Sequence, residues 1–440
     1  MNITVIGGGY VGVTTATILA KVYGHNVVCV EPDTDKLSHL QQGVAPFYEP
    51  KLDAAIKSAI TKSRLLFVPQ IVKQFGKIQI IAVGTPAMPD GSTDLSQVIT
   101  ATSSVAELMD QETVIAIKST VPPGTCDMLI DLVASILARR GVTHTWSLVS
   151  NPEFLSEGSA IHDATNPDRI IVGGYNDLGF AAMSEVYGYH TIIEMDIRAA
   201  ELTKYVANAM LATRITLMNQ VANLADVMQI DVRQVMYAVG TDSRIGHTHM
   251  TPGIGYGGSC FPKDIASLVN LSERQGVSMS VLDACQQANT RQPKVLCDKI
   301  VRRFGDDLRG RKFAIWGVSF KPDTNDMRAA PSLPIIKFLV DNGATVVIHD
   351  PQSRTTCAAA LMNVLLTEQQ TQVSYVSEPL DGVVDSDAVL LLTDWHEYHY
   401  VDTNTLPSVM KTPCFFDGRN HCERDFMINS GIEYYSIGQG

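Results

Sequence analysis

The sequence predicts an α/β protein in which a long central helix and a helical segment join two doubly wound domains. The first and last thirds of the chain alternate short apolar segments with helical apolar spacing, as parallel sheets covered by helices do. From about residue 197 to 239 Gly and Pro are absent and the apolar period is helical, which predicts one long helix followed by shorter ones. Because 440 residues exceed one typical core, we place domain boundaries at 1–196, 197–300 and 301–440.

The individual elements follow from the same patterns. Short apolar segments predict strands at Thr4–Ile6, Asn26–Val30, Ile78–Val83, Val114–Lys118, Phe313–Gly317, Thr345–Asp350 and Ala388–Leu392. Helical spacing predicts helices at Val13–Leu19 and Leu333–Val340. The Gly-rich segment 252–258 is expected to be a loop.

Composition narrows the class of protein. Hydrophobic residues make up 45% of the chain and the formal net charge is −12, which argues against nucleic acid or an anionic membrane as the main partner. We expect no membrane span and no secretory signal, because a strand-like segment begins at Asn2. The eight cysteines are scattered without a Cys-x-x-Cys pair, which favours a reduced, cytoplasmic protein without a metal site.

A glycine turn predicts the cofactor. Gly7, Gly9 and Gly12 fit the pattern G-x-G-x-x-G between a strand and a helix, where backbone can approach a pyrophosphate. Glu31 ends the next strand, 19 positions after Gly12, where a carboxylate binds ribose hydroxyls and repels a 2′-phosphate. We therefore predict NAD; the alternative is a turn that only packs helix on strand. The second turn, 317–321, lacks the pattern and suits another nucleotide or a structural role.

Cys260 is the candidate nucleophile. It lies in the segment Gly255–Asp264, framed by glycines and followed four positions later by the carboxylate of Asp264. A thiol nucleophile needs such access, although a structural cysteine in a tight loop fits equally well. Lys204 and Asn208 are four residues apart and share one face of the long helix. The alternative for Lys204 is a lysine whose stem covers a half-buried face.

Two carboxylates lie in a predicted loop. Glu153 and Glu157 belong to the segment Asn151–Gly158, whose apolar residues could raise a carboxyl pKa for acid–base work. The alternative is a pair of exposed glutamates that cap a helix.

These segments, in this order, resemble the UDP-glucose/GDP-mannose dehydrogenase family, and within it the UDP-glucose dehydrogenases. The resemblance covers nearly the whole chain. Besides the glycine turn, Lys204, Asn208 and the Cys260 loop, it includes 84–86, 118–122, 151–158, 244–246, 320–322, 326–328 and 416–419.

The resemblance implies a role for each matching residue. The catalytic group would be Cys260 as nucleophile, with Lys204, Asp264, Asn208, Thr120, Glu153 and Glu157. NAD would be held by Gly7, Gly9, Tyr10, Val11, Gly12, Glu31, Lys36, Thr85, Thr120, Glu157, Lys263 and Arg328. The UDP-sugar would be held by Glu153, Phe154, Leu155, Lys204, Asn208, Arg244, His249, Thr251, Gly253, Gly257, Phe320, Lys321 and Arg419.

The resemblance also implies the reaction and the assembly. The expected reaction is oxidation of the C6 alcohol of UDP-glucose to the acid by two NAD, through a thioester on Cys260. The expected assembly is a homodimer along the central helix, in which Arg244 reaches the neighbour's substrate.

The chain departs from the usual family residues at several positions. His249 and Thr251, where family members often have an aromatic residue and an Asn or Lys, bear on the uracil and diphosphate contacts. Glu31 replaces the more usual Asp, and either carboxylate can bond the ribose; Ala329 and Ala330 replace Glu-Ser and are expected to be tolerated. Enzymes for GDP-mannose or N-acetylated UDP-sugars are the nearest alternatives, but they tend to differ from this chain around Cys260. A one-step hydroxyacid dehydrogenase and a non-catalytic NAD-binding protein are the others.

Overall fold

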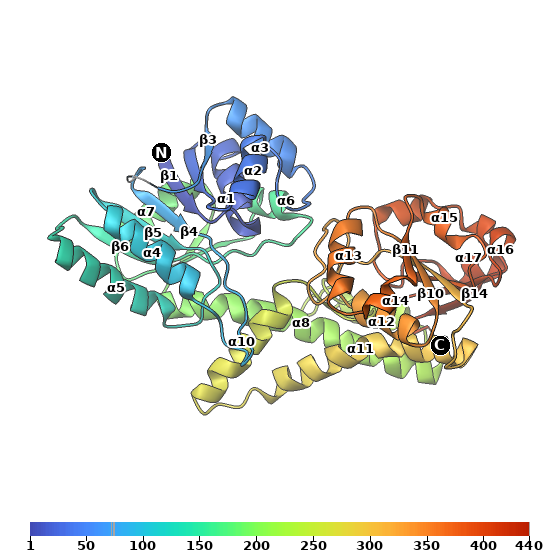
Figure 1. The fold of residues 1–440 in the computed structure, drawn as a ribbon. Helices are drawn as coiled ribbons and strands as arrows, with labels where there is room; N and C mark the ends of the chain where they lie inside the picture. The colour runs from blue at the N-terminus through green and yellow to red at the C-terminus, as the bar shows by residue number, and fades with distance from the viewer. Residues whose placement is uncertain (72, 74, 440) are drawn as a thin grey trace. The chain divides into compact units, whose positions relative to one another are not determined.

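The computed structural model describes residues 1–71, 73 and 75–439, which divide into two compact units (Figure 1). The first unit comprises Met1–Ala207 with Ala266–Val277, and the second comprises Asn208–Ile265 with Ser278–Gly440. Each unit is built around its own sheet, so the predicted α/β class is confirmed. The predicted boundaries at residues 196 and 300 stay a prediction.

The first unit contains an eight-stranded sheet in the order β3-β2-β1-β4-β5-β6-β7-β8. Its first six strands are parallel and follow the doubly wound order, and β7 runs antiparallel to β6. The strands are β1 (Asn2–Ile6), β2 (Asn26–Val30), β3 (Leu65–Val68), β4 (Ile78–Ile81), β5 (Thr113–Ile117), β6 (Trp146–Ser150), β7 (Ile170–Gly173) and β8 (Ile192–Met195). The helices are α1 (Tyr10–Lys21), α2 (Thr34–Gln41), α3 (Leu52–Thr61), α4 (Ser96–Leu108), α5 (Thr125–Arg140), α6 (Ala160–Thr165) and α7 (Asp177–Tyr187).

The central strands of this sheet are buried on both faces. Every residue of β4 and β5 is buried, because helices cover the sheet on either side. The apolar residues Val13, Ala16 and Leu19 of α1 pack in the core beside Ile3 and Val5 of β1. This packing fixes the start of α1 directly after the end of β1, where the glycine turn lies.

The second unit contains a six-stranded parallel sheet in the order β11-β10-β9-β12-β13-β14, again the doubly wound order. The strands are β9 (Lys312–Trp316), β10 (Thr345–His349), β11 (Val373–Tyr375), β12 (Ala388–Leu391), β13 (Cys414–Asp417) and β14 (Glu433–Ser436). The helical elements are α9 (Val232–Gly240), α11 (Ser280–Phe304), α12 (Ser332–Asp341), α13 (Arg354–Met362), α14 (Thr367–Gln370), α15 (Pro379–Val383), η1 (His396–Tyr400), η2 (Thr403–Thr405), α16 (Leu406–Val409) and α17 (Arg424–Asn429).

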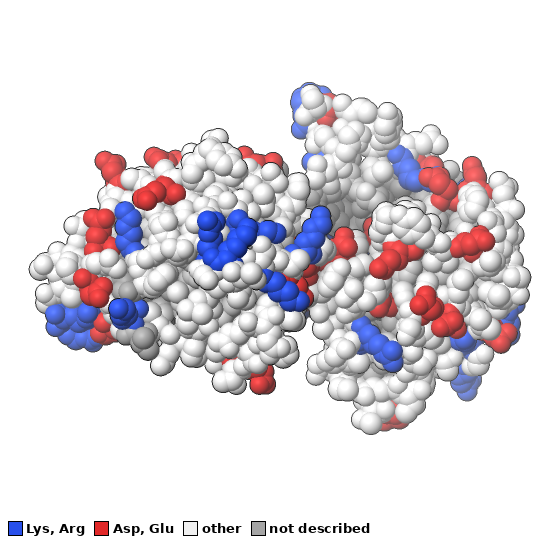
Figure 2. Space-filling view, turned by 90° about the horizontal axis from the view of Figure 1, so that it is seen from above, with Lys and Arg blue, Asp and Glu red and all other residues white. Residues whose placement is uncertain are grey.

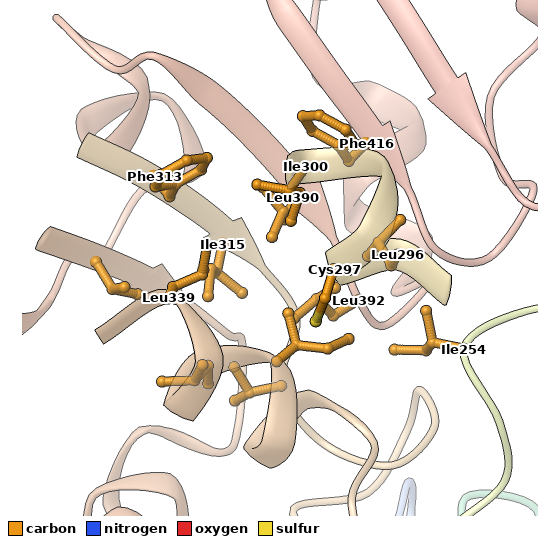
Figure 3. Packing of buried hydrophobic residues seen from close by; sticks show 14 of the residues in the cluster. Ile254, Leu296, Cys297, Ile300, Phe313, Ile315, Leu339, Leu390, Leu392 and Phe416 are labelled. Atoms are coloured by element: carbon orange, nitrogen blue, oxygen red, sulfur yellow. The ribbon is translucent and has the colours of Figure 1, made fainter. Parts of the chain in front are cut away.

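The core of this unit forms between the sheet and several helices, among them α11, α12 and α13. Figure 3 shows Leu296 and Ile300 of α11 beside Leu390 of β12 and Phe416 of β13, with Ile254 approaching from a loop. Ile254 precedes the Cys260 segment, so this packing anchors one end of the candidate catalytic loop.

Two helices belong partly to each unit. The 32-residue α8 (Ile197–Met228) begins in the first and ends in the second, whereas α10 (Phe261–Arg274) begins in the second and ends in the first. The long central helix and the shorter α9 after it are therefore confirmed. In the described part of the chain, no helix is both long and apolar enough to cross a membrane.

The face of the molecule that Figure 2 shows carries charges of both signs. Most of the face that Figure 2 shows is uncharged, and Lys and Arg side chains lie on it as well as Asp and Glu. The net charge of −12 therefore does not form one continuous acidic surface on this face.

Candidate active site

The glycine turn between β1 and α1 is too tight for other residues. Gly7 has φ 116°, and a Cβ there would lie 2.4 Å from the carbonyl oxygen of Ala82. A Cβ on Gly12 would lie 1.8 Å from the carbonyl oxygen of Gly7. Both positions therefore need glycine for close backbone packing.

The same turn fits a dinucleotide. Gly9 is the N-cap of α1, has no side chain to cap the helix, and a Cβ there would meet nothing within 4 Å. An uncapped helix N-terminus in open space favours an anion such as a pyrophosphate. Glu31 follows β2 and is 7% exposed, and a Cβ on Gly8 would lie 2.4 Å from its Oε2, so its carboxylate lies against the turn. This placement suits the ribose hydroxyls of NAD.

The other predicted cofactor residues fall into two groups. Thr85 and Thr120 follow the neighbouring strands β4 and β5 in the first unit, and Lys36 is exposed on α2. Lys263 and Arg328 belong to the second unit, where their side chains pair with Asp264 and Asp326, respectively.

Lys204 and Glu153 form a buried ion pair in the first unit. Their Nζ and Oε1 atoms are 3.2 Å apart, and the side chains are 4% and 7% exposed. Glu153 also accepts a hydrogen bond from the N–H of Leu155 (2.5 Å), and the Lys204 ammonium lies 5.3 Å from the centre of the Phe154 ring. The alternatives of a half-buried lysine and of an exposed, helix-capping Glu153 are therefore wrong. Glu157 is half-buried in the same loop.

The loop that carries Cys260 is fixed by close backbone packing in the second unit. The N–H of Gly258 donates to the carbonyl oxygen of Arg328 (2.8 Å), and a Cβ on Gly257 would lie 2.3 Å from the carbonyl oxygen of Ala329. On the other side, Asn289 of α11 accepts from the N–H of Tyr256 (2.9 Å). The glycines therefore serve close packing around the cysteine.

Cys260 differs from the buried cysteines. It is partly exposed and immediately precedes α10, and its carbonyl oxygen accepts from the N–H of Asp264 (2.9 Å). By contrast, burial raises the pKa of Cys297, Cys357 and Cys414 to about 12. A thiol at a helix N-terminus is better placed to react as thiolate.

Asp264 lies one helical turn after Cys260 and is 1% exposed. Its carboxylate accepts hydrogen bonds from Asn208 Nδ2 (2.6 Å) and Lys263 Nζ (2.5 Å). Within the second unit, Asn208 therefore contacts Asp264, which lies four residues after Cys260 in the sequence.

Arg419 ties two predicted substrate segments to the residue that follows β12. Its guanidinium donates to the carbonyl oxygens of Gly255 (3.3 Å), Phe320 (3.0 Å) and Leu392 (2.7 Å). The buried Asp417, whose pKa is raised by burial, accepts from the N–H of Arg419 (2.9 Å) and fixes that loop.

The remaining predicted substrate residues lie in the same unit. Gly253 donates its N–H to Asn219 Oδ1 (2.8 Å), and Lys321 Nζ lies 5.9 Å from the Phe320 ring. His249 and Thr251 are exposed in the loop before Gly253.

An internal carboxylate holds the backbone of the turn after β9. The N–H groups of Val318 and Ser319 donate to Oδ2 of the buried Asp350 (2.7 and 3.3 Å), as does the indole N–H of Trp395 (3.2 Å). Asp350 directly follows β10, as Glu31 follows β2. An internal carboxylate thus uses these backbone donors, and both roles that the sequence leaves open for the turn stay predictions.

Two buried glutamates were missed by sequence reasoning. Glu201 of α8 accepts from the N–H groups of Gly124 and Cys126 (both 2.7 Å), and burial raises its pKa. Glu49 contacts Tyr10 and the loop after Glu157. For each glutamate, the sequence offers only a single carboxylate in a locally apolar segment as a signal. The hydrogen-bond partners of both glutamates lie far away in the sequence.

Comparisons with known proteins cover all regions of the chain. Three models of the UDP-glucose/GDP-mannose dehydrogenase family match it in order: the NAD binding domain at residues 1–191, the central domain at 198–291 and the UDP binding domain at 314–424. Curated UDP-glucose 6-dehydrogenases from Pseudomonas aeruginosa and Bacillus subtilis are 36% and 37% identical, and each match covers 100% of this chain and 98% of the relative.

Solved structures agree with these matches. A UDP-glucose dehydrogenase from Pyrobaculum islandicum has a TM-score of 0.88 and 33% identity, and the match covers 100% of this chain and 98% of that one. A UDP-N-acetyl-mannosamine dehydrogenase from Staphylococcus aureus has a TM-score of 0.77 at 24% identity, covers 99% of this chain and 98% of its own, and shows the fold alone. The predicted resemblance is thus confirmed: the chain belongs to the UDP-glucose/GDP-mannose dehydrogenase family and is an NAD-dependent dehydrogenase.

Proposed function

We propose that this chain oxidises the C6 alcohol of UDP-glucose to the carboxylate, with Cys260 as the nucleophile and two NAD consumed. The observation that carries the proposal is the position of Cys260, which is partly exposed at the start of α10 and one turn before the buried Asp264. The names of the relatives that match the whole chain support UDP-glucose as the substrate.

The reaction removes four electrons in two steps. NAD, when bound, accepts one hydride in each step. Between the steps, the Cys260 sulfur bonds to C6 of the aldehyde and the carbonyl oxygen takes a proton, which gives a thiohemiacetal. Loss of the second hydride and of the hydroxyl proton leaves a thioester. Water then attacks the thioester carbonyl, the C–S bond breaks, and the acid and the Cys260 thiol are released.

The charged residues have separate roles in this scheme. Lys204, with Asn208 one turn later on α8, stabilises the oxygen at C6 when it carries negative charge; such a donor contributes about 3–4 kcal/mol. Asp264, with Lys204, assists transfer of the alcohol proton. Glu153 is the proposed base for thioester hydrolysis, while Thr120 and Glu157 position water and cofactor.

Several loops are proposed to bind the sugar nucleotide. Phe154 and Leu155 belong to the loop that also carries Glu153. In the second unit, the proposed contacts are His249, Thr251, Gly253, Gly257, Phe320 and Lys321. Arg419 supports this assignment because it ties the segments around Gly255 and Phe320 together.

The stoichiometry tests the proposed function. Complete conversion of UDP-glucose is expected to give about two NADH per sugar, since alcohol and aldehyde are oxidised in sequence. The measurement is the absorbance of NADH against the amount of UDP-glucuronate, with GDP-mannose and UDP-N-acetylhexosamines as comparison substrates. One NADH per sugar with free aldehyde as the product would contradict the thioester route, and preference for another nucleotide sugar would contradict the substrate.

A homodimer is proposed from the surface of α8. In the second unit, Met210, Leu217, Leu224 and Met228 are 57–68% exposed on one side of this helix, whereas Ala222 on another side is buried in the core. An apolar face of this kind suits a second copy of the chain. We further propose a cytoplasmic location, because the eight cysteines are scattered along the chain without a Cys-x-x-Cys pair.

Arg244 is proposed to complete the substrate site of the neighbouring copy. Arg244 follows α9, and its side chain is 86% exposed. Its guanidinium donates hydrogen bonds to the Asp242 carboxylate and lowers the pKa of that group. A planar, permanently charged guanidinium on such a surface suits a phosphate of another subunit's ligand.

Mixed dimers test this sharing. Arg244→Ala and Cys260→Ala chains are expected to be inactive alone and to regain part of the activity when mixed. A mixed dimer places both defects in one site and neither in the other. Turnover is measured after subunit exchange, with dimer formation followed by differently tagged chains. Mixed dimers that form and stay inactive would show that Arg244 acts within its own chain.

A further inference from the structure

A buried carboxylate joins two parts of the first unit that the proposed mechanism treats separately. Glu49 is 5% exposed and lies in the segment between α2 and α3. Its Oε2 accepts hydrogen bonds from the hydroxyl of Tyr10 and from the N–H of Gly158 (2.7 Å), and its Oε1 accepts from the N–H of Ala160 (2.8 Å). Its partners thus lie 39, 109 and 111 positions away in the sequence.

Two of the three partners belong to proposed binding elements. Tyr10 is the first residue of α1 and directly follows Gly9 of the cofactor turn. Gly158 ends the loop that carries Glu153, Phe154, Leu155 and Glu157. Burial and the Glu49 carboxylate raise the pKa of Tyr10, so its hydroxyl remains a donor to this carboxylate at neutral pH.

We propose that Glu49 is a positioning residue that fixes the loop 153–158 to the start of α1, so that cofactor binding at the glycine turn also orders the substrate loop. This inference rests on the proposed function, because that function assigns the two elements to cofactor and sugar. Glu49 touches neither ligand in this scheme and acts through Tyr10 and through the backbone of Gly158 and Ala160.

The geometry requires a carboxylate at this position. Both oxygens of Glu49 accept hydrogen bonds from N–H or O–H groups, and a carboxylate is an acceptor only. In Glu49→Gln the amide NH₂ must face at least one of these donors, whichever way the amide turns. The substitution keeps the size of the side chain, but at least one of the hydrogen bonds from Tyr10, Gly158 or Ala160 is lost.

The experiment compares Glu49→Gln with a matched control. Asp387→Asn changes a carboxylate that is 1% exposed in the second unit and accepts from Arg311 Nη1 (2.9 Å) and the N–H of Lys312 (3.0 Å). Both substitutions remove a buried acceptor, so both are expected to lower Tm. Only Glu49→Gln is expected to lower kcat/KM for UDP-glucose, by about 100-fold, because misplacement of a binding loop by about 1 Å has an effect of this size.

Hydrogen exchange gives a second readout that does not depend on the sugar. In the unchanged protein and in Asp387→Asn, NADH is expected to slow amide exchange in a peptide covering residues 153–165. In Glu49→Gln this slowing should be lost although NADH still binds. Tyr10→Phe removes the hydroxyl that donates to Glu49 and keeps the backbone of Tyr10 at the cofactor turn, so it should show the same loss while NADH still binds. It therefore serves as the second variant if Glu49→Gln does not fold.

The outcomes separate this inference from the proposed function. If the unchanged protein does not oxidise UDP-glucose, the proposed substrate is wrong, and the exchange experiment still decides the role of Glu49. If Glu49→Gln or Tyr10→Phe retains the NADH-dependent slowing, or if Glu49→Gln loses no more kcat/KM than Asp387→Asn, Glu49 is a structural residue only.

Discussion

Cys260→Ala protein is expected to fold and to bind NAD and UDP-glucose, yet to form almost no UDP-glucuronate. The sulfur is the only group removed, so the aldehyde has no nucleophile with which to form a thiohemiacetal. When the C6 aldehyde is supplied directly, the variant should fail to oxidise it to the acid. It should still reduce the aldehyde with NADH, because that step is assigned to Lys204 and Asp264. Product acid and NADH are measured separately.

Cys357→Ala is the matched control, since Cys357 is fully buried in the core of the second unit. It should lower the free energy of unfolding by roughly 1 kcal/mol and retain acid formation. Near-normal acid formation from the aldehyde by folded Cys260→Ala protein would overturn the nucleophilic role.

Lys204→Met is expected to damage both stability and turnover. It leaves the Glu153 carboxylate buried without its cation, which costs about 3–5 kcal/mol of unfolding free energy. Loss of a charged donor to the C6 oxygen should lower kcat by roughly 10²–10³-fold. Denaturant unfolding and steady-state kinetics measure the two effects.

The double variant Lys204→Met/Glu153→Gln separates these effects. Replacing both charges removes the unpaired carboxylate, so most of the unfolding free energy should return while kcat stays low. Recovery of kcat together with stability would show that the ion pair serves packing alone.

Much of the fold could be predicted because the relevant signals are local. Asn26–Val30 is a strand with the predicted bounds, and α12 extends the predicted helix by one residue at each end. The helix predicted at Val13 begins at Tyr10 instead, because the glycine turn itself supplies the N-cap. Strands such as β8 and β11 gave weaker signals, since they lie at sheet edges and several of their residues are exposed or half-buried.

The site could be predicted only where its parts are close in the sequence. Asp264 follows Cys260 within one helical segment, so the sequence suggested their relation. The pairing of Lys204 with Glu153 spans 51 positions and depends on how α8 packs beside the loop after β6. The role of Glu49 depends on Gly158, 109 positions away, and no local pattern reports such a contact.

The carboxylate of Asp350 accepts hydrogen bonds from the backbone of the turn after β9, as a bound anion would. A higher concentration of NAD cannot displace a group that is covalently part of the chain. The turn at Gly7 is the proposed position of one dinucleotide, whereas the proposed oxidation uses two in succession. The half-oxidised sugar therefore has to outlast one exchange of cofactor. In the proposed mechanism, the covalent bond to Cys260 gives the half-oxidised sugar a lifetime that does not depend on how quickly that exchange occurs.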